Sequence, residues 1–395
     1  MSSYHSYFTY RDYSSLGKGL VICAFNADNG DSSAFLGMES IYTENPHTGV
    51  RYDYGAKYNN VASFEITLKT FDNSDFSVER FRDVARWLSG ATKSYWLDLY
   101  EGNALAYSFL CRCVDIQHYK MDARIIGVTA TFESVSPWAY SPMQTITRQV
   151  VNRSLEEYKD SWEERKGYQG LIGDLAGGEK HGWPIVIDNL SDEQYSYLYP
   201  NIEFSNQLVY KFTGDNKTKN FVLRHRLPNL TSLTVDGEEV SPDDYLYKES
   251  VIFFNIAPKQ GAEICAFGNF GETDLFILNK TTKELAIVSN IAVDEVITIN
   301  NNHLIYSSKG TRIFGKDFNL VWPRLVPGEN VITTAGTGTL KITYRYPIKI
   351  GDCAININAN LHGPVCELSQ REVATSEKIE ETFMDIYTNV FGGVI

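Results

Sequence analysis

The chain has 395 residues, of which 43% are hydrophobic and 22% are charged, so it is long enough for two or three domains with separate cores. No segment approaches the roughly eighteen uninterrupted apolar residues of a membrane-spanning helix. The formal net charge is −13 and no run is rich in lysine or arginine, which argues against stable nucleic-acid binding, because such binding needs clustered positive charge.

The N-terminus and the cysteines indicate the compartment. The first residues include neither a basic nor an apolar segment, so no signal peptide is expected and synthesis in a cytoplasm is predicted. Six cysteines in a chain of this length do not indicate a disulfide framework. Cys111 and Cys113 lie in a predicted strand and are expected to point to opposite faces, which argues against a disulfide or a shared metal.

The first 140 residues or so are predicted to be mostly strand. Residues 63–69 alternate strictly, with Phe64, Ile66 and Leu68 on one face and polar residues on the other. Residues 126–132 repeat the pattern. This segment is therefore expected to form a sheet with one apolar face.

One helix is predicted between those strands, over residues 77–88. Ser77 can cap its start and Gly90 lies just past its end. Its apolar face is expected to consist of Val78, Phe81, Ala85 and Leu88. Two prolines within residues 136–142 should then end the domain, because proline cannot continue a central strand.

A charged segment and a glycine-rich one separate the two halves of the chain. In residues 152–167, Ser154 and Glu157 have the spacing of a capping box, which predicts a short exposed helix. Residues 167–182 contain six glycines and are predicted to be a flexible connector. A solvated linker is preferred over a binding helix here.

The second half returns to short strands and turns, as in a β-sandwich of the jelly-roll type. Asp236-Gly237 is a hairpin turn signal. A late strand is predicted from alternating residues, which are Leu340, Ile342, Tyr344 and Tyr346.

The C-terminus changes character from about Ser376. Apolar residues recur there at helical spacing until Gly392-Gly393, so an amphipathic helix is predicted. Its apolar face must pack against its own chain or against a partner. The candidate partner-docking residues are Ile379, Phe383, Ile386 and Val390.

No catalytic or metal-binding constellation with convincing spacing is found. The chain has no G-x-S-x-G elbow, H-E-x-x-H helix or Walker loop, and its seven histidines are scattered. Polar turns are preferred over a calcium loop at residues 28–31 and over a glycosidase carboxylate pair at Asp243-Asp244. No enzyme, cofactor or metal is therefore expected.

Several N-terminal features occur in a recognisable order. An aromatic segment at residues 7–10 precedes the strand around Phe64 and the helix ending at Leu88, and residues 95–99 follow. The segment closes on residues 132–140, FESVSPWAY. This order resembles the N-terminal domain of siphophage distal tail proteins.

A second resemblance lies near the end of the chain. Residues 322–332, WPRLVPGENVI, and the strand at 340–346 are similar to the last turn and strand of that family's galectin-like C-terminal domain. Pro-Gly-Glu-Asn is interpreted as a tight turn that sets the register of a final hairpin. Other strands of that domain resemble residues 183–185, 199–202 and 278–285.

The resemblance implies a mainly β fold: an N-terminal β-domain with one packed helix, then a galectin-like jelly-roll sandwich with an inserted β-module and a C-terminal helix. Residues 207–270 depart from the family pattern and resemble a small β-module of phage tail and fibre proteins. The expected boundaries are 1–145 for the ring-forming domain, 146–182 for the charged helix and linker, 183–206 with 271–350 for the sandwich, 207–270 for the module and 351–395 for the extension.

The resemblance also implies a function. It predicts a structural subunit of the virion's tail tip or baseplate, made in the host cytoplasm, that forms a hexameric ring between tail tube and tail hub. The expected partners are further copies, the tail tube protein, the tail hub or tail-associated protein and a receptor-binding protein, with DNA only passing through the lumen and no membrane insertion. The alternatives are a carbohydrate-binding module for host cell-surface glycans and, less favoured, a tail-associated cell-wall hydrolase.

Overall fold

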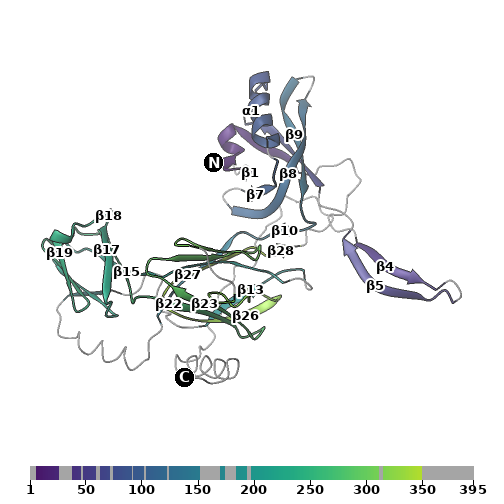
Figure 1. Ribbon diagram of the computed structural model, residues 1–395. Helices are drawn as coiled ribbons and strands as arrows, with labels where there is room; N and C mark the ends of the chain where they lie inside the picture. The colour runs from purple at the N-terminus through teal and green to yellow at the C-terminus, as the bar shows by residue number, and fades with distance from the viewer. Residues whose placement is uncertain are drawn as a thin grey trace. The chain divides into compact units, whose positions relative to one another are not determined.

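The computed structural model describes residues 6–25, 38–45, 48–58, 63–71, 74–90, 92–101, 104–121, 124–151, 170–173, 184–193, 197–310 and 315–348. The described chain is mainly β, as predicted, with one α-helix (Figure 1). It divides into two compact units. Of the described residues, unit 1 contains those up to 143, residues 191–193 and residues 345–348, and unit 2 contains those within 144–190 and 194–344.

Unit 1 is built on one antiparallel sheet whose main path runs β2-β1-β7-β8-β9-β6-β3, with β10 and β28 off this path. The predicted strand with Phe64, Ile66 and Leu68 on its buried face is confirmed as β6, and residues 126–132 lie within β9, its neighbour. The strand bounds are β1 (Tyr7–Tyr10), β2 (Tyr13–Ser14), β3 (Leu20–Phe25), β6 (Ser63–Thr70), β7 (Tyr95–Glu101), β8 (Ala104–Met121), β9 (Arg124–Ser134), β10 (Ala139–Tyr140) and β28 (Pro347–Ile348).

The predicted helix is confirmed as α1 (Val78–Ser89), with Ser77 as N-cap and Gly90 as C-cap. The Ser77 hydroxyl accepts a hydrogen bond from the Arg80 amide at 3.2 Å. The apolar face was partly wrong, because Val78 is 77% exposed. The residues that the helix buries are Val84, Trp87 and Leu88.

Trp87 explains why the buried face of α1 differs from the predicted one. Its indole N–H donates to the Tyr10 carbonyl at 2.7 Å, and its ring stacks on Phe8 at 5.5 Å. A tryptophan buries a large apolar area and needs a partner for its N–H, so this contact fixes the helix against β1. Val78, in the first turn, then faces solvent.

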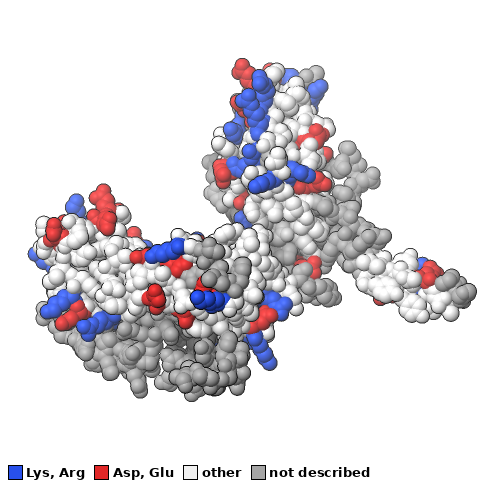
Figure 2. Space-filling model, in the orientation of Figure 1, with Lys and Arg blue, Asp and Glu red and all other residues white. Residues whose placement is uncertain are grey.

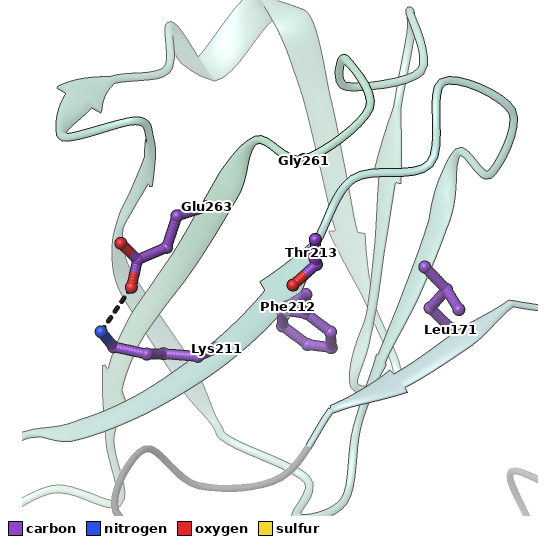
Figure 3. A pocket seen from close by; sticks show the side chains of 6 residues that line it. All are labelled: Leu171, Lys211, Phe212, Thr213, Gly261 and Glu263. Carbon is purple, nitrogen blue, oxygen red and sulfur yellow. Dashed lines mark hydrogen bonds and ion pairs between the residues drawn. The ribbon is translucent and has the colours of Figure 1, made fainter.

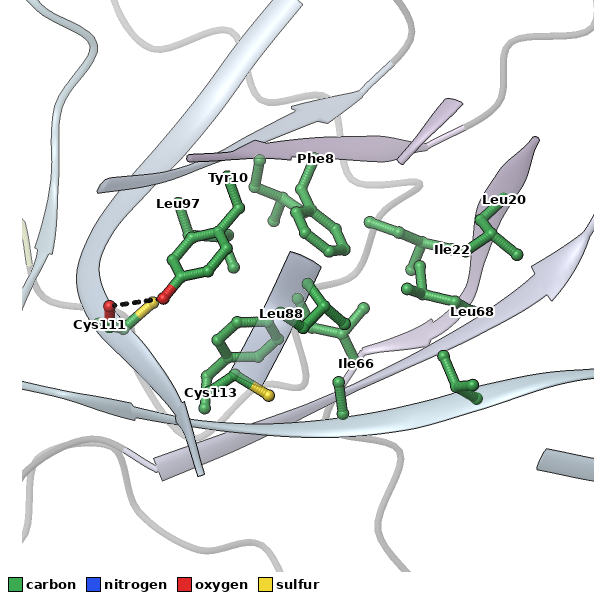
Figure 4. Packing of buried hydrophobic residues seen from close by; sticks show 14 of the residues in the cluster. Phe8, Tyr10, Leu20, Ile22, Ile66, Leu68, Leu88, Leu97, Cys111 and Cys113 are labelled. Atoms are coloured by element: carbon green, nitrogen blue, oxygen red, sulfur yellow. Dashed lines mark hydrogen bonds between the residues drawn. The ribbon is translucent and has the colours of Figure 1, made fainter. Parts of the chain in front are cut away.

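Cys111 and Cys113 belong to the same core cluster, so the prediction that they face opposite sides of β8 was wrong (Figure 4). Residues two apart in a strand share a face. Both are free thiols. Burial raises the pKa of Cys113 to about 12 and raises that of Cys111 well above its usual range.

These two thiols are expected to be unreactive in the folded protein, because the thiolate is the nucleophile and burial disfavours it. Timed alkylation with iodoacetamide at about pH 8, followed by peptide mass spectrometry, should label the exposed Cys23 first. Cys111 and Cys113 should be labelled only after denaturant is added. Labelling of Cys111 as fast as Cys23 would show that this side of the core opens readily.

Unit 2 contains a sandwich of two antiparallel sheets, drawn as two layers in Figure 1. Along most of these strands burial alternates, so each sheet has one buried face. The five-stranded sheet has the order β11 (Gln144–Val150), β27 (Gly338–Tyr344), β14 (Asn201–Ser205), β24 (Val296–Ile299), β25 (Ile305–Ser307). The four-stranded sheet has the order β13 (Ile185–Asn189), β26 (Gly328–Ala335), β22 (Thr273–Asn279), β23 (Glu284–Ile291).

The late strand and its turn differ from the sequence prediction in two ways. Leu340, Ile342 and Tyr344 are buried in β27 as predicted, but the strand ends before Tyr346. The predicted final hairpin is wrong, because β26 and β27 lie in different sheets and do not pair. Gly336 lies between β26 and β27, where the chain passes from one sheet to the other. Its φ is +134°, and a Cβ there would lie 2.5 Å from the Asp274 carbonyl oxygen, so this position favours glycine.

A second pair of four-stranded sheets forms the inserted module of unit 2, and it has its own core around Tyr210, Phe221 and Ile264. The predicted turn at Asp236-Gly237 is confirmed: both residues have positive φ and join β17 to β18. The strand orders are β12 (Leu171–Gly173), β16 (Asn220–Leu223), β20 (Val251–Phe254), β19 (Tyr245–Lys248), and β15 (Leu208–Thr213), β21 (Glu263–Asn269), β17 (Asn229–Val235), β18 (Glu238–Glu239).

The connector contributes to both parts of unit 2. Residues 144–150, which the sequence assigns partly to the linker, form β11 along β27. Residues 171–173 form β12, which pairs in parallel with β16 of the module. The predicted helices at 152–167 and in the C-terminal extension lie outside the described residues.

Candidate interaction surfaces

The described residues offer no arrangement suited to metal binding: nowhere among them do three or more His, Cys, Asp or Glu side chains come together. Asp243 and Asp244 lie in a short 3-10 turn capped by Ser241, so the predicted surface turn is confirmed. The segment 28–31 and the docking residues Ile379, Phe383, Ile386 and Val390 lie outside the described residues. Where the chain is described, no helix is long and apolar enough to span a membrane.

A two-stranded hairpin of unit 1, here called the arm, is the most exposed element of the described chain (Figure 1). It consists of β4 (Met38–Glu44) and β5 (Arg51–Tyr58), which pair with each other in a separate sheet. Every residue of 40–44 and 48–55 is exposed. Its surface in Figure 2 is mostly uncharged.

The two faces of the arm differ. Tyr52 and Tyr54 alternate along β5 and are 54% and 67% exposed. Ile41, 43% exposed, lies within the bulge that interrupts the pairing of β4 with β5, two residues before Thr43, the partner of Tyr52. The opposite face has the charged residues Glu44, Arg51 and Asp53 together with Tyr42, which is 47% exposed and has the Arg51 guanidinium over its ring at 4.6 Å. The arm therefore has an apolar face on which the structure describes no packing partner.

An isolated two-stranded hairpin is at best marginally stable in water. Exposed, contiguous apolar side chains usually mark an interaction surface. Both considerations make the arm a candidate interaction surface. The signal in the sequence was Tyr52-x-Tyr54 beyond a Pro-x-x-Gly turn, and sequence reasoning missed it because alternation alone does not tell a buried strand from a protruding one.

A cluster of side chains around Arg345 lies on strands β7 and β8 of unit 1. Its guanidinium pairs with the Asp98 carboxylate at 2.8 Å and lies over the Trp96 ring at 4.5 Å. The Ser108 hydroxyl also contacts both charged groups. The side chains of Arg345 and Asp98 are only 11% and 21% exposed. Arg345 directly follows β27, so the chain leaves unit 2 at this point and returns to unit 1.

The inserted module contains an open cavity of about 500 Å³ (Figure 3). Lys211 and Glu263 form an ion pair at its wall, which raises the pKa of the Lys211 ammonium and lowers that of the Glu263 carboxyl through their hydrogen bond. Leu171 of β12 also lines it. The two charges therefore offset each other at the wall of the cavity.

Charge is unevenly shared along the chain. Residues 1–143 contain 12 basic and 16 acidic side chains, a net charge of −4 out of −13. In Figure 2, lysines and arginines gather over α1, where Arg82 and Arg86 are exposed, and acidic groups are interspersed elsewhere on the visible face. Most of the acidic excess therefore lies in the rest of the chain.

The model of a phage tail protein N-terminal domain matches residues 3–136, and the model of a phage tail C-terminal domain matches residues 260–344. Together they cover more than half of the chain, so the chain belongs to the phage tail protein family that these two domains define. Most of the inserted module lies outside both matches.

Solved structures similar to this chain include the SPP1 Dit (gp 19.1) protein, described as a paradigm of the hub adsorption apparatus in phages that infect Gram-positive bacteria. The identity is 9%, the match covers 86% of this chain and 99% of that chain, and the TM-score is 0.43. Two structures of the phage p2 baseplate in its activated conformation match at 8% identity, over 88% of this chain and 99% of theirs, with TM-scores of 0.41 and 0.42. No curated protein matches.

Proposed function

We propose that this phage tail protein is a non-enzymatic subunit of the tail tip or baseplate and forms a hexameric ring of the distal tail type. The observation that carries the proposal is the arm, whose apolar face needs a partner surface. In a closed ring each subunit presents one surface to one neighbour and a different surface to the other. A protruding arm on each copy suits such a head-to-tail contact.

The partners follow from that role. The ring joins the tail tube protein to the tail hub or tail-associated protein and to a receptor-binding protein, and the inserted module and the residues Ile379, Phe383, Ile386 and Val390 are surfaces for such contacts. DNA passes through the lumen without stable binding. If residues 1–143 line that lumen, their net charge of −4 per chain repels DNA only weakly.

Removing the arm's tyrosines is expected to break the ring. In Tyr52→Ser with Tyr54→Ser, each contact loses two large apolar side chains, so association should weaken by ~2–4 kcal/mol. Native mass spectrometry should give a particle near six times 44.7 kDa for the unmodified chain and monomers for the variant.

The matched control is Leu246→Ser with Ile256→Ser, since these side chains are 60% and 82% exposed but lie in the inserted module. It should leave the hexamer intact. A monomeric unmodified chain at every concentration would rule out the ring. A hexamer that survives the tyrosine changes would show that the arm does not hold it together.

The glycan-binding alternative requires a sugar site within residues 183–350. These residues do not include the arm, so ring formation through the arm would leave such a site free. The hydrolase alternative requires carboxylates or a nucleophile in a shared cavity. The cavity beside Lys211 and Glu263 has these two charges paired with each other, which does not favour that chemistry.

A further inference from the structure

We propose that the sandwich of unit 2 carries a binding site for a neutral carbohydrate chain, formed by Tyr197, Tyr199, His303, Trp322 and Arg324, here called the aromatic platform. These residues come from three segments that are far apart in the sequence. The proposal does not depend on ring formation, because it uses a different part of the chain.

Backbone pairing brings the segments together. Leu198 and Leu325 form an isolated antiparallel bridge, with N···O distances of 3.0 and 2.8 Å. His303 belongs to the turn between β24 and β25. In that turn the Asn300 side chain accepts from the Asn302 and Leu304 amides at 3.0 and 2.9 Å. The platform is therefore held by fixed backbone and not by side chains alone.

The rings form a continuous row of contacts across this surface, each ring touching the next. Tyr199 meets the His303 ring at 4.3 Å, and His303 meets Trp322 at 5.4 Å, both edge to face. Trp322 in turn meets the buried Phe318 at 5.1 Å. Tyr197 is 48% exposed and His303 is exposed. The group is thus anchored in the core at one end and open to solvent at the other.

Arg324 provides the polar part of the platform. Its guanidinium lies over the Tyr197 ring at 3.9 Å and pairs with both oxygens of Glu284, at 2.7 and 2.6 Å. The side chains of both partners remain more than a quarter exposed. A guanidinium has five N–H donors and a carboxylate has about four acceptor positions, so each group can still form hydrogen bonds with a ligand on its solvent side.

This combination favours a neutral sugar. An aromatic ring offers an apolar surface to the C–H face of a pyranose, and adjacent donors and acceptors suit vicinal hydroxyl groups, which both donate and accept. The pairing with Glu284 neutralises Arg324, so an anionic ligand gains little.

Affinity electrophoresis of the full-length protein tests the proposal, with gels containing dextran, laminarin, pectic galactan or mannan. At least one gel should retard the unmodified chain. Tyr197→Ala and His303→Ala should each reduce that retardation at least about tenfold, equivalent to losing ~1.4 kcal/mol. The control is Tyr306→Ala, a tyrosine 54% exposed on β25 that pairs across the strand with Thr298, and it should migrate like the unmodified chain.

Two outcomes would overturn the proposal. One is the absence of retardation in all four gels, or equal retardation of all variants. The other is that Tyr197→Ala blocks incorporation into tail tips while no gel retards the unmodified protein, which would make the platform a protein contact. Circular dichroism spectra should be identical for all variants, because the changed side chains are exposed.

Discussion

Asn330→Ala is expected to lower the free energy of unfolding of unit 2 by about 3 kcal/mol. Asn330 is fully buried at the start of β26. Its side-chain oxygen accepts from the Val326 amide at 2.9 Å and its amide group donates to the Val326 and Gly328 carbonyls at 2.7 and 3.0 Å. Asn279 donates to the same oxygen at 3.2 Å. Alanine removes all four bonds.

Differential scanning calorimetry should detect this as a lower melting temperature for the transition of unit 2. Asn330→Asp should be destabilised at least as much, because it keeps the oxygen but loses both donors. Asn302→Ala is the matched control, an exposed asparagine in the same unit, and should stay within about 0.5 kcal/mol of the unmodified chain. If Asn330→Asp were as stable as the unmodified protein, the side chain would serve only to fill space.

Arg345→Ala is expected to destabilise unit 1, also by about 3 kcal/mol. The change leaves the mostly buried Asp98 carboxylate without its cation and uncovers the Trp96 ring. It also loosens the segment that carries β28, where the Ser141 and Tyr346 backbones are joined by an N–H···O bond of 2.9 Å. Urea unfolding followed by tryptophan fluorescence measures the loss.

An exposed ion pair on the same sheet provides the control. Arg112 and Glu133 lie 3.5 Å apart with side chains about half exposed, so Arg112→Ala should cost no more than about 0.5 kcal/mol. An equal loss for the two arginine variants would contradict a special role of Arg345. A chain ending before Arg345 should show the same defect as Arg345→Ala or a larger one, since it lacks β28 as well.

Local patterns predicted the elements that depend on neighbouring residues. Strict alternation identified β6 and β9, because a strand with one buried face must alternate. Ser77 and Gly90 fixed the ends of α1, because the unpaired amides and carbonyls of a helix end need such residues. The order of weak motifs correctly indicated a phage tail protein.

Contacts between distant residues decided the rest. The buried face of α1 depends on the contact of Trp87 with Tyr10, and the burial of Arg345 depends on Asp98 and Trp96, which lie far earlier in the chain. Asn330 lies in β26, whose neighbours are β13 and β22 and not β27, and its side chain accepts a hydrogen bond from the distant Asn279.

The sequence by itself determined a mainly β tail protein with one capped helix, since periodicity and capping act over a few residues. Only the tertiary structure decided which apolar strands are buried and which, like the arm, remain exposed. It also decided that Tyr199, His303 and Trp322 contact one another, and that Tyr197 lies under Arg324 beside them. The physical reason is that alternation specifies a face but not what covers it, and the covering elements come from far along the chain.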